Sequence, residues 1–247
     1  MPLTLAATSP GEPEIFASIQ GEGVSAGRPA TFIRLSRCNL ACVWCDTPYT
    51  WHFTGDNRPH RDEETYDNSA NQVVLEEADA ASHIAALGGR RLVVTGGEPL
   101  LQAPALARML EVLAALHPMH VEVETNGTVA PPPAFDAQVH QYNVSLKLAN
   151  SGNPSELAQR PDRIAQWADD QRAWFKFVIA DPQDLSEILQ IQRDYEIAAG
   201  RIFLMPEGRD GATLHEHMRW LGEICQDHGF NLTDRLHIHL YGDTRGT

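Results

Sequence analysis

The sequence predicts an α/β fold built on a parallel sheet. Short apolar runs of strand length alternate with longer segments whose apolar residues recur at helical spacing. The alternation yields about seven strands, each separated from the next by a helix or a loop. Strands joined by crossover helices pair in parallel, which leaves an open doubly wound sheet or a full or partial barrel.

Each predicted strand is a short run rich in apolar and β-branched residues. In chain order the predicted strands are residues 30–36, 91–95, 120–125, 141–147, 174–180, 201–206 and 235–242. The helical segments end at a glycine or a proline, or carry a proline near their start. The predicted helices are residues 75–89, 103–118, 155–170 (broken near Pro161), 182–200 and 213–229.

One polar segment interrupts the alternation. Residues 52–72 are charge-dense and rich in turn-forming residues, which indicates a surface insertion or flexible loop that borders the opening of the site. A chain of 247 residues is within the size that α/β barrels reach without splitting, so we expect residues 1–247 to form a single domain with this insertion.

The charge balance disfavours nucleic acid as a partner. Lys and Arg total 19 and Asp and Glu total 33, so the formal net charge is −14. A phosphate-binding surface needs an excess of basic residues, and we therefore expect a small substrate or a protein partner. The N-terminal residues lack a basic region, and no stretch approaches the roughly 18 consecutive apolar residues of a membrane helix. These features predict a soluble, cytoplasmic protein.

The residues that carry chemistry come directly after predicted strands, in the segments 38–47, 95–99, 124–128 and 145–153. In a parallel βα fold the loops that follow the strands share one face of the molecule. These segments are therefore expected to converge there, and that face is the predicted active site.

Cys38, Cys42 and Cys45 lie in the first of these loops with the spacing C-x3-C-x2-C. A structural zinc site normally takes four protein ligands, and the nearest fourth ligand in the sequence is His52. A 4Fe–4S cluster held by three cysteines leaves one iron open for another ligand, which suits three thiolates in a tight loop better. Cys225 lies alone in a helical pattern and is expected to be a small buried hydrophobe.

The cysteine loop, with Trp44 before its last cysteine, and the segment TGGEP resemble the signature of the radical S-adenosylmethionine (radical SAM) superfamily. The resemblance implies a partial (β/α) TIM-like barrel of parallel strands with an additional C-terminal strand. It also implies a 4Fe–4S cluster whose open iron chelates SAM, and a one-electron reduction that cleaves SAM to methionine and a 5′-deoxyadenosyl radical. Gly96 and Gly97 would let the backbone approach a ligand, and Glu98 would offer a carboxylate to the methionine amine.

The stretch EIFASIQGEGVSAGRPATFIRLSRCNLACVWCDT resembles the 7-carboxy-7-deazaguanine synthase family, as do VEVETNGT, FKFVI, LMPEG and HIHLYG. The resemblance implies a lyase of 7-deazapurine and queuosine precursor biosynthesis, which converts 6-carboxy-5,6,7,8-tetrahydropterin to 7-carboxy-7-deazaguanine with loss of ammonia. It further implies SAM as a regenerated cofactor, a need for Mg²⁺, a flavodoxin or ferredoxin as electron donor, and a homodimer.

The resemblance also assigns site residues, with the radical chemistry carried by SAM and by no catalytic side chain. Cys38, Cys42 and Cys45 would hold the cluster, and Thr47 would bind Mg²⁺, although Asp46 is the more obvious ligand by charge. The expected SAM contacts are Trp44, Gly96, Gly97, Glu98, Thr125, Asn126, Ser145 and Lys147. The expected substrate contacts are Ile19, Gln20, Gly21, Glu22, Gly23, Arg34, Thr95, Gly97, His237 and His239.

Several of these assignments depend on the local chemistry. The Gln20 amide and the Glu22 carboxylate suit the donor and acceptor edge of a pterin. Arg34 could pair with the substrate carboxylate or form an ion pair at the barrel rim, and both interpretations stay open. Leu146 stands where the family more usually has proline, which leaves the shape of that loop open. His237 and His239 alternate along the last predicted strand and would face the barrel mouth together.

Two other functions compete with the synthase. A glycyl-radical activase would use similar motifs but consume SAM and act on a partner protein, and it has no need of the segments SIQGEG and CDT. A zinc-stabilised binding protein without catalysis would need a fourth metal ligand.

Overall fold

The computed structural model describes residues 2–247, and within them an 11-stranded sheet forms the centre of the molecule. The parallel strands are β4 (Pro29–Leu35), β6 (Arg91–Gly96), β7 (His120–Thr125), β8 (Gln141–Val144), β9 (Ala173–Ile179), β10 (Ile202–Pro206) and β11 (Asn231–Leu232). The antiparallel strands are β1 (Leu3–Ser9), β2 (Glu12–Pro13), β3 (Ile15–Ile19) and β5 (Gln72–Leu75).

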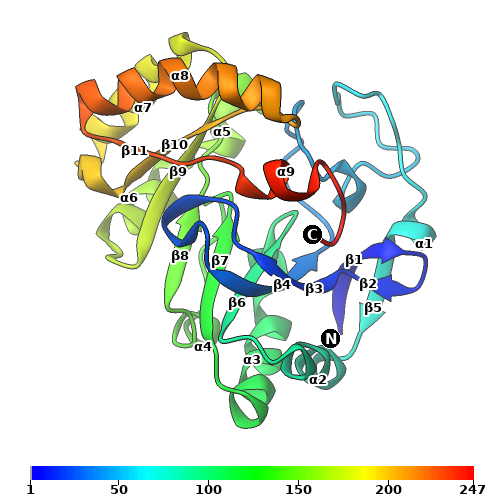
Figure 1. Ribbon diagram of the computed structural model, residues 1–247. Coiled ribbons are helices and arrows are strands. Elements are labelled where there is room, and N and C mark those ends of the chain that lie inside the picture. The colour runs from blue at the N-terminus through cyan, green and yellow to red at the C-terminus, as the bar shows by residue number, and fades with distance from the viewer. Residues whose placement is uncertain (1) are drawn as a thin grey trace.

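The sheet is an open, curved arc and does not close into a full barrel. Its strand order is β11-β10-β9-β8-β7-β6-β4-β1-β2, with β3 also paired to β4 and β5 paired to β1. One end of the parallel part is β11, and the other end, β4, is continued by antiparallel strands. The prediction of a partial barrel with parallel strands is confirmed, and Figure 1 shows the helix α9 (Leu236–Tyr241) beside the open side of the arc.

Helices cover the outer face of the sheet (Figure 1). They are α2 (Glu77–Leu87), α3 (Ala103–Leu116), α4 (Pro133–Asp136), α5 (Ser155–Ala158), α6 (Pro161–Asp169), α7 (Leu185–Asp194) and α8 (Gly211–His228), and the short α1 (Asn68–Asn71) precedes β5. Single 3₁₀ turns lie at Gly23–Ser25, Pro48–Thr50, Pro99–Gln102, Ala149–Ser151, Pro182–Asp184 and Ala199–Arg201.

The predicted helices are observed, but the one expected over residues 182–200 is shorter, since α7 ends at Asp194 and Gly200 lies in a separate 3₁₀ turn. Gly88 and Gly229 end α2 and α8 in the left-handed conformation, with φ angles of 71° and 69°, which glycine adopts without strain. Asp210 caps the start of α8 by accepting hydrogen bonds from the N–H groups of Ala212 and Thr213. The break near Pro161 is also observed, because α5 and α6 are separate helices.

The two faces of the parallel strands bury different kinds of side chain. Val121 and Val123 of β7 point outward into the apolar core that the helices cover. Glu122 and Glu124 alternate with them and point to the inner face, where Glu122 is fully buried and pairs with Arg91 at 2.9 Å. The inner face therefore holds charges that only a polar interior can accommodate.

The segment from Pro99 to Leu116 is long and apolar enough, by length and composition alone, to pass as a membrane-spanning helix. Half of it is buried inside the molecule, and α3 packs against α2 and contributes Leu106, Met109 and Leu110 to the main core. Its apolar character is accounted for by this packing.

The predicted C-terminal strand at residues 235–242 is wrong. Residues 236–241 form α9, and the last strand of the sheet is the two-residue β11 further upstream. The alternation of apolar residues and histidines has the period of a strand, but Arg235 at the start of α9 is drawn toward Glu22 and Asp46, which turns the chain away from the sheet edge.

The antiparallel strands were not predicted, because no helix separates them and the alternation of strand and helix misses them. β1 pairs with β4 and β5, and β3 pairs with β4 along its whole length, from Ile15 with Ile33 to Ile19 with Pro29. This pairing places residues 20–22, which follow β3, at the inner edge of the sheet. The polar segment 52–72 also packs more closely than a solvated loop, since His52 and His60 are buried and Phe53 bridges to Tyr66.

Candidate active site

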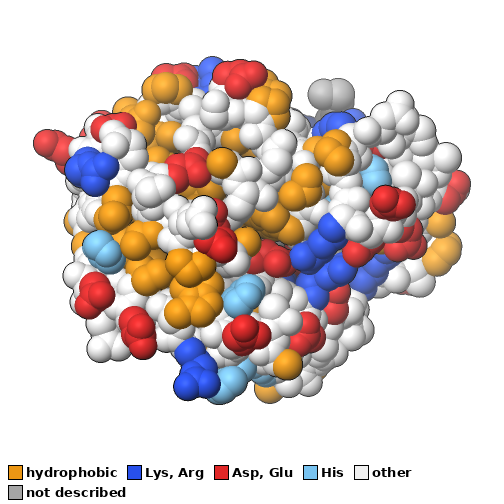
Figure 2. Space-filling view, turned by 90° about the horizontal axis from the view of Figure 1, so that it is seen from above, with side chains coloured by type: hydrophobic (Ala, Val, Ile, Leu, Met, Phe, Trp, Pro, Cys, Tyr) orange, Lys and Arg blue, Asp and Glu red, His pale blue; other side chains and the backbone are white. Residues whose placement is uncertain are grey.

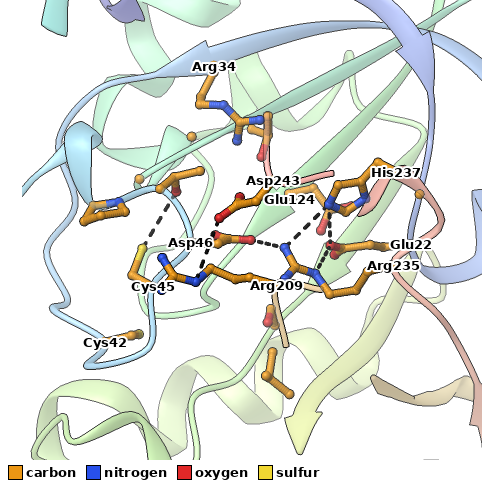
Figure 3. Close-up of a pocket in the computed structure, with 18 of the residues that line it drawn as sticks. Glu22, Arg34, Cys42, Cys45, Asp46, Glu124, Arg209, Arg235, His237 and Asp243 are labelled. Atoms are coloured by element: carbon orange, nitrogen blue, oxygen red, sulfur yellow. Dashed lines mark hydrogen bonds and ion pairs between the residues drawn. The ribbon is translucent and has the colours of Figure 1, made fainter. Parts of the chain in front are cut away.

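A cavity of about 360 Å³ lies at the carboxyl ends of the parallel strands. Its wall includes the cysteine loop, the ends of β6, β7 and β8, inward-facing residues of β9, the segment after β3, and the C-terminal residues. Figure 3 shows Cys42 and Cys45 on one side, Glu22, Arg235 and His237 on the other, and Asp46 between them. The four segments expected to converge do so here, with one residue of the insertion, Tyr66, also in the wall.

The cysteine loop is fixed by hydrogen bonds from its backbone to other loops. Arg37 donates its N–H to Thr50 O at 2.7 Å and adopts a positive φ of 77°, which turns the chain sharply into Cys38. Within the loop Cys45 N donates to Cys42 O, and Val43 N donates to Ser151 O at 2.9 Å. All three thiols are free, and each lines the cavity.

The thiols suit a cluster better than a single ion. In the described part of the chain no three His, Cys, Asp or Glu side chains are arranged to hold one metal ion. His52, the nearest candidate for a fourth zinc ligand, engages Glu64 O through Nδ1 at 2.7 Å. Burial raises the pKa of Cys38 to about 12 and of Cys45 to about 11, so iron has to displace protons when it binds. A 4Fe–4S cluster, in which each thiolate holds a different iron, fits this spread set of sulfurs.

Gly96 and Gly97 allow the end of β6 to cross the segment before Cys38 at close range. A Cβ on Gly96 would lie 2.1 Å from Leu35 O, and one on Gly97 would lie 2.2 Å from Arg37 O. Gly96 also has a φ of 137°, which side chains disfavour. Both glycines line the cavity, so the same close approach leaves their backbone open to a ligand.

Glu98 was expected to contact SAM, but it does not line the cavity. Its carboxylate is fully buried and accepts hydrogen bonds from the N–H of Asn126 at 2.7 Å, the N–H of Leu100 at 2.9 Å and the hydroxyl of Thr125 at 2.9 Å. It therefore ties the loop after β6 to the loop after β7. In this arrangement Glu98 positions Thr125 and Asn126, which do line the cavity.

The loop after β8 presents a lysine beside the cysteine loop. Lys147 donates to the Ser145 hydroxyl at 2.7 Å, and its ammonium lies 5.8 Å from the ring centre of Trp44. Leu146, where the family more usually has proline, is buried and turned away from the cavity against Gly127. Its substitution for proline leaves Ser145 and Lys147 facing the site.

Glu22 is the centre of the opposite wall. Lys176 pairs with it at 2.6 Å and Arg235 at 3.3 Å, and Lys176 also pairs with Glu124 at 2.8 Å. Burial alone would raise the pKa of Glu22, but the charges of Lys176, Arg235 and His237 outweigh it and lower the pKa well below its usual range. Glu22 is therefore a carboxylate with fixed geometry at neutral pH.

The backbone of Gly21 packs closely against the side chain of His237. A Cβ on Gly21 would lie 2.1 Å from His237 Nδ1, and Leu236 N donates to Gly21 O at 3.0 Å. This contact holds the start of α9 against the segment that carries Gln20 and Glu22. Burial lowers the pKa of His237, with Glu22 opposing the shift.

Arg34 forms an ion pair with Glu14, which was one of the two roles that the sequence left open, the other being a contact with the substrate carboxylate. Its Nε donates to Glu14 at 2.7 Å, and the Tyr49 hydroxyl donates to the other oxygen of Glu14 at 3.0 Å. The arginine nevertheless lines the cavity. Thr47 lies there too, with its hydroxyl 3.7 Å from Cys45 Sγ, whereas Asp46 is drawn to Arg235.

Most of the predicted residues line the cavity. They are Ile19, Gln20, Gly21, Glu22, Arg34, Cys38, Cys42, Trp44, Cys45, Thr47, Thr95, Gly96, Gly97, Thr125, Asn126, Ser145, Lys147 and His237. Gly23 is outside it and donates to Thr233 Oγ1, and His239 pairs with Asp234 at 3.0 Å near the surface. His237 and His239 point apart because α9 is a helix and not the predicted strand.

The structure adds charged residues that sequence reasoning missed, namely Glu124, Lys176, Arg209, Arg235 and Asp243. Lys176 had a signal, because it is the one charged residue in the apolar run WFKFVI. No sequence pattern indicated Arg235 or Asp243, because their positions depend on the helix α9 that replaces the predicted strand.

Comparisons with known proteins agree with this site. The model of the radical SAM superfamily matches residues 32–150, which include the cysteine loop and the ends of β6, β7 and β8. A 7-carboxy-7-deazaguanine synthase of Pyrobaculum aerophilum is 38% identical over 94% of this chain and 95% of its own. The chain belongs to the 7-carboxy-7-deazaguanine synthase family.

A second relative of that name, from Halobacterium salinarum, is 33% identical over 95% of this chain and 91% of its own. Among solved structures, QueE from Escherichia coli matches with a TM-score of 0.63 at 23% identity and covers 95% of both chains. Streptococcus suis SuiB matches with a TM-score of 0.52 at 15% identity over 82% of this chain and 47% of its own. At these identities both structures support the fold alone.

Family membership makes the chain a radical SAM enzyme with a 4Fe–4S cluster and SAM as cofactors, and it does not favour a glycyl-radical activase. The superfamily match covers residues 32–150, so it includes neither Glu22 nor the residues after Asn150. The charged wall around Glu22, Lys176 and Arg235 therefore lies outside the shared radical SAM segment. In this synthase family member, that wall is the part of the cavity expected to distinguish one substrate from another.

Proposed function

We propose that the chain converts 6-carboxy-5,6,7,8-tetrahydropterin to 7-carboxy-7-deazaguanine with loss of ammonia, in the biosynthesis of 7-deazapurines. One observation carries the proposal. In a chain that is 38% identical to a synthase of that name, a single cavity joins the three-cysteine loop to the ion-paired carboxylate of Glu22.

The cysteine side of the cavity is proposed to bind the cofactors. The cluster, once reduced by an external donor, would supply the electron that cleaves bound SAM to methionine and the 5′-deoxyadenosyl radical that begins the reaction. Cys38, Cys42 and Cys45 are the proposed cluster ligands. The proposed SAM contacts are the cavity residues Trp44, Gly96, Gly97, Thr125, Asn126, Ser145 and Lys147, and Glu98 would act on SAM only through Thr125 and Asn126.

The opposite wall is proposed to bind the pterin. The guanidine-like edge of a pterin carries N–H donors, and a carboxylate that is held ionised, as Glu22 is, accepts them strongly. Gln20 Oε1 accepts the Glu22 N–H at 3.3 Å and so supports the loop. Glu14 takes the Nε–H of Arg34, which directs its terminal nitrogens to the substrate carboxylate as a fork.

The cavity wall is proposed to keep water from the radical. A primary carbon radical abstracts hydrogen from whatever it meets, so the reacting carbon has to be aligned and shielded. Tyr66 of the insertion and the residues from Gly242 to Thr247 border the cavity on its open side, which supports this role.

Other parts of the proposal are supported by the family resemblance. Thr47 is proposed to bind Mg²⁺ together with substrate oxygens and waters, because a single hydroxyl is a weak ligand and Asp46 is engaged by Arg235. We also propose a flavodoxin or ferredoxin as the source of the low-potential electron, a homodimer, and a cytoplasmic location.

The test is an anaerobic assay. The protein is reconstituted with iron and sulfide and given SAM, Mg²⁺, reductant and 6-carboxytetrahydropterin, and mass spectrometry follows product and SAM together. Many molecules of 7-carboxy-7-deazaguanine per SAM lost are expected. A brown protein that cleaves SAM without forming the deazaguanine would overturn the substrate assignment, and a colourless protein would overturn the cluster.

A further inference from the structure

Two side chains outside the cysteine motif direct N–H groups at the sulfurs of the loop. The indole Nε1 of Trp51 donates to Cys45 Sγ at 3.4 Å, and the amide Nδ2 of Asn153 donates to Cys42 Sγ at 3.3 Å. Both distances are those of an N–H donor hydrogen-bonded to a sulfur acceptor. Among side-chain donors, Cys38 has only a longer contact, 3.9 Å from Asn126, whose amide also donates to Asn39 at 3.0 Å. Backbone N–H groups donate as well, from Leu40 to Cys38 and from Thr47 to Cys45.

Both donors are held in place by their surroundings. Trp51 is buried, follows the 3₁₀ turn Pro48–Thr50, and its ring lies under the guanidinium of Arg58 at 4.7 Å. Asn153 uses its Oδ1 to accept the N–H of Ala41, in the cysteine loop, at 2.8 Å. The second contact fixes the orientation of the amide, so that its NH₂ end and not its oxygen faces Cys42.

We propose that Trp51 and Asn153 are positioning residues that set the reduction potential of the cluster, by donating one N–H each to the sulfurs of Cys45 and Cys42. The inference rests on the proposed function, because it requires the cluster. Reduction adds one negative charge to the cluster and its thiolates, and an N–H donor stabilises that charge. Each donor therefore makes the cluster easier to reduce.

The inference explains the position of residues that the radical SAM motif does not require. Asn153 lies beyond the residues 32–150 that the superfamily model matches, and it does not line the cavity. Its contacts are with the cysteine loop and with Ser151, so its chemical effect is exerted on Cys42. Outer hydrogen bonds of this kind tune metal centres without binding them.

The test is the midpoint potential of the reconstituted, SAM-free protein, followed by EPR during an anaerobic redox titration, after iron and sulfide have been counted. Trp51→Phe keeps an aromatic ring and removes the N–H. Asn153→Asp keeps the oxygen that holds Ala41 and replaces the donor by a negative charge. Trp167→Phe is the matched control, because Trp167 is outside the cavity wall and its indole N–H donates to Gly127 O at 2.9 Å and to no sulfur.

Trp51→Phe is expected to make the midpoint more negative by about 59 mV, which for one electron is about a tenfold fall in the ratio of reduced to oxidised cluster at the wild-type midpoint. Asn153→Asp is expected to shift it further in the same direction, and Trp167→Phe is expected to leave it unchanged. An unchanged or more positive midpoint in both variants would overturn the inference. A variant that assembles no cluster would overturn it for that residue in favour of a structural role.

These outcomes are separate from those of the activity assay. A wild-type protein that assembles a 4Fe–4S cluster but whose variants keep its potential would leave the proposed function standing. A wild-type protein that assembles no cluster would overturn the proposed function itself.

Discussion

At the scale of single residues, Gly21 allows the segment after β3 to pack closely against the start of α9. Gly21→Ala would place a methyl group 2.1 Å from His237 Nδ1 and displace the start of α9. We expect a loss of about 1–3 kcal/mol in the free energy of unfolding, which is typical of overpacking, and a larger loss of activity. Denaturant unfolding and the synthase assay measure the two effects.

Gly200→Ala is the matched control for that substitution. A Cβ on Gly200 meets no atom within 4 Å, and its φ is not in the left-handed region. Equal stability and activity of the Gly21→Ala and Gly200→Ala proteins would contradict this close packing.

Glu22 predicts a specific pH dependence of stability. Burial, the largest single influence, would raise its pKa above the reference value of 4.5, but the charges of Lys176, Arg235 and His237 together lower it in the folded protein, with Lys176 the first of these. A lowered folded pKa adds stability above the unfolded pKa, and that stability is lost as the pH falls below about 4.5. The difference in unfolding free energy between wild type and Glu22→Gln should therefore be largest at pH 7 and shrink toward pH 3.

Denaturant unfolding across that range provides the measurement, and Glu216→Gln, on an exposed part of α8, is the control. A difference that stays constant from pH 7 to pH 3 would show that Glu22 is not held as a carboxylate by its partners.

Residue types in the loops were largely predictable, and their partners were not. The motif around Cys38, Cys42 and Cys45 identifies the cavity because cluster chemistry demands thiolates at close spacing. Glu98 shows the limit: a carboxylate in a glycine-rich loop suits an ammonium, yet in the fold three donors of the chain saturate it. The ion pairs of Lys176 could not be predicted, because Glu22 and Glu124 are far from it in sequence and only the fold brings them together.

At the scale of elements, the parallel strands and their helices follow from periodicity and from glycine and proline stops. The antiparallel strands β1 and β3 do not, because they join without a helix and their pairing is fixed by β4 at a distance in sequence. α9 has the period of a strand and forms a helix, since the ion pairs of Arg235 and the contact of His237 with Gly21 outweigh that local preference.

The C-terminal residues and the insertion form a joint element at the open side of the cavity. The guanidinium of Arg245 lies 3.6 Å from the ring centre of Tyr49 and 5.5 Å from that of Tyr66, and it donates to Asn71 at 2.8 Å. Arg209 pairs with Asp62 at 2.7 Å and Arg61 pairs with Glu207 at 2.7 Å, which ties the insertion to the segment after β10.

Arg245→Ala should loosen this element. We expect KM for the pterin to rise about 5- to 30-fold, which corresponds to the loss of roughly 1–2 kcal/mol of cation–π contact, with a smaller change in kcat and with SAM cleavage partly uncoupled from product. Steady-state kinetics and a count of 5′-deoxyadenosine per product measure both. Arg219→Ala, on an exposed part of α8, is the control, and equal KM values in the two variants would contradict the joint element.

At the scale of the whole molecule, Figure 2 shows acidic and basic side chains interspersed on the face seen from above, without the broad basic area that a nucleic acid requires. Acidic side chains are thus dispersed over this face, and a concentrated group of charges lies inside, around Glu22, Lys176 and Arg235.

The cluster should stabilise the whole fold and not only its loop. The loop contacts β4, the loop after β6 and the segment around Ser151, so a cluster that binds only the folded form adds its binding free energy to the stability of all of them. We expect the reconstituted protein to unfold several degrees above the same protein after iron is removed by a chelator. Anaerobic thermal unfolding tests this, with Cys225→Ser as a control for general thiol effects, and equal Tm values would contradict it.

The open arc of the sheet determines how this chain can change. A closed barrel seals its circumference with backbone hydrogen bonds, so its mouth can be altered only by changing the number or register of strands. Here α9 and the residues up to Thr247 complete the wall without pairing as a strand, through side chains and the hydrogen bond from Leu236 N to Gly21 O. Substitutions in that short terminal segment can therefore reshape the chamber for a different heterocycle while the cluster, its loop and the parallel strands are inherited intact.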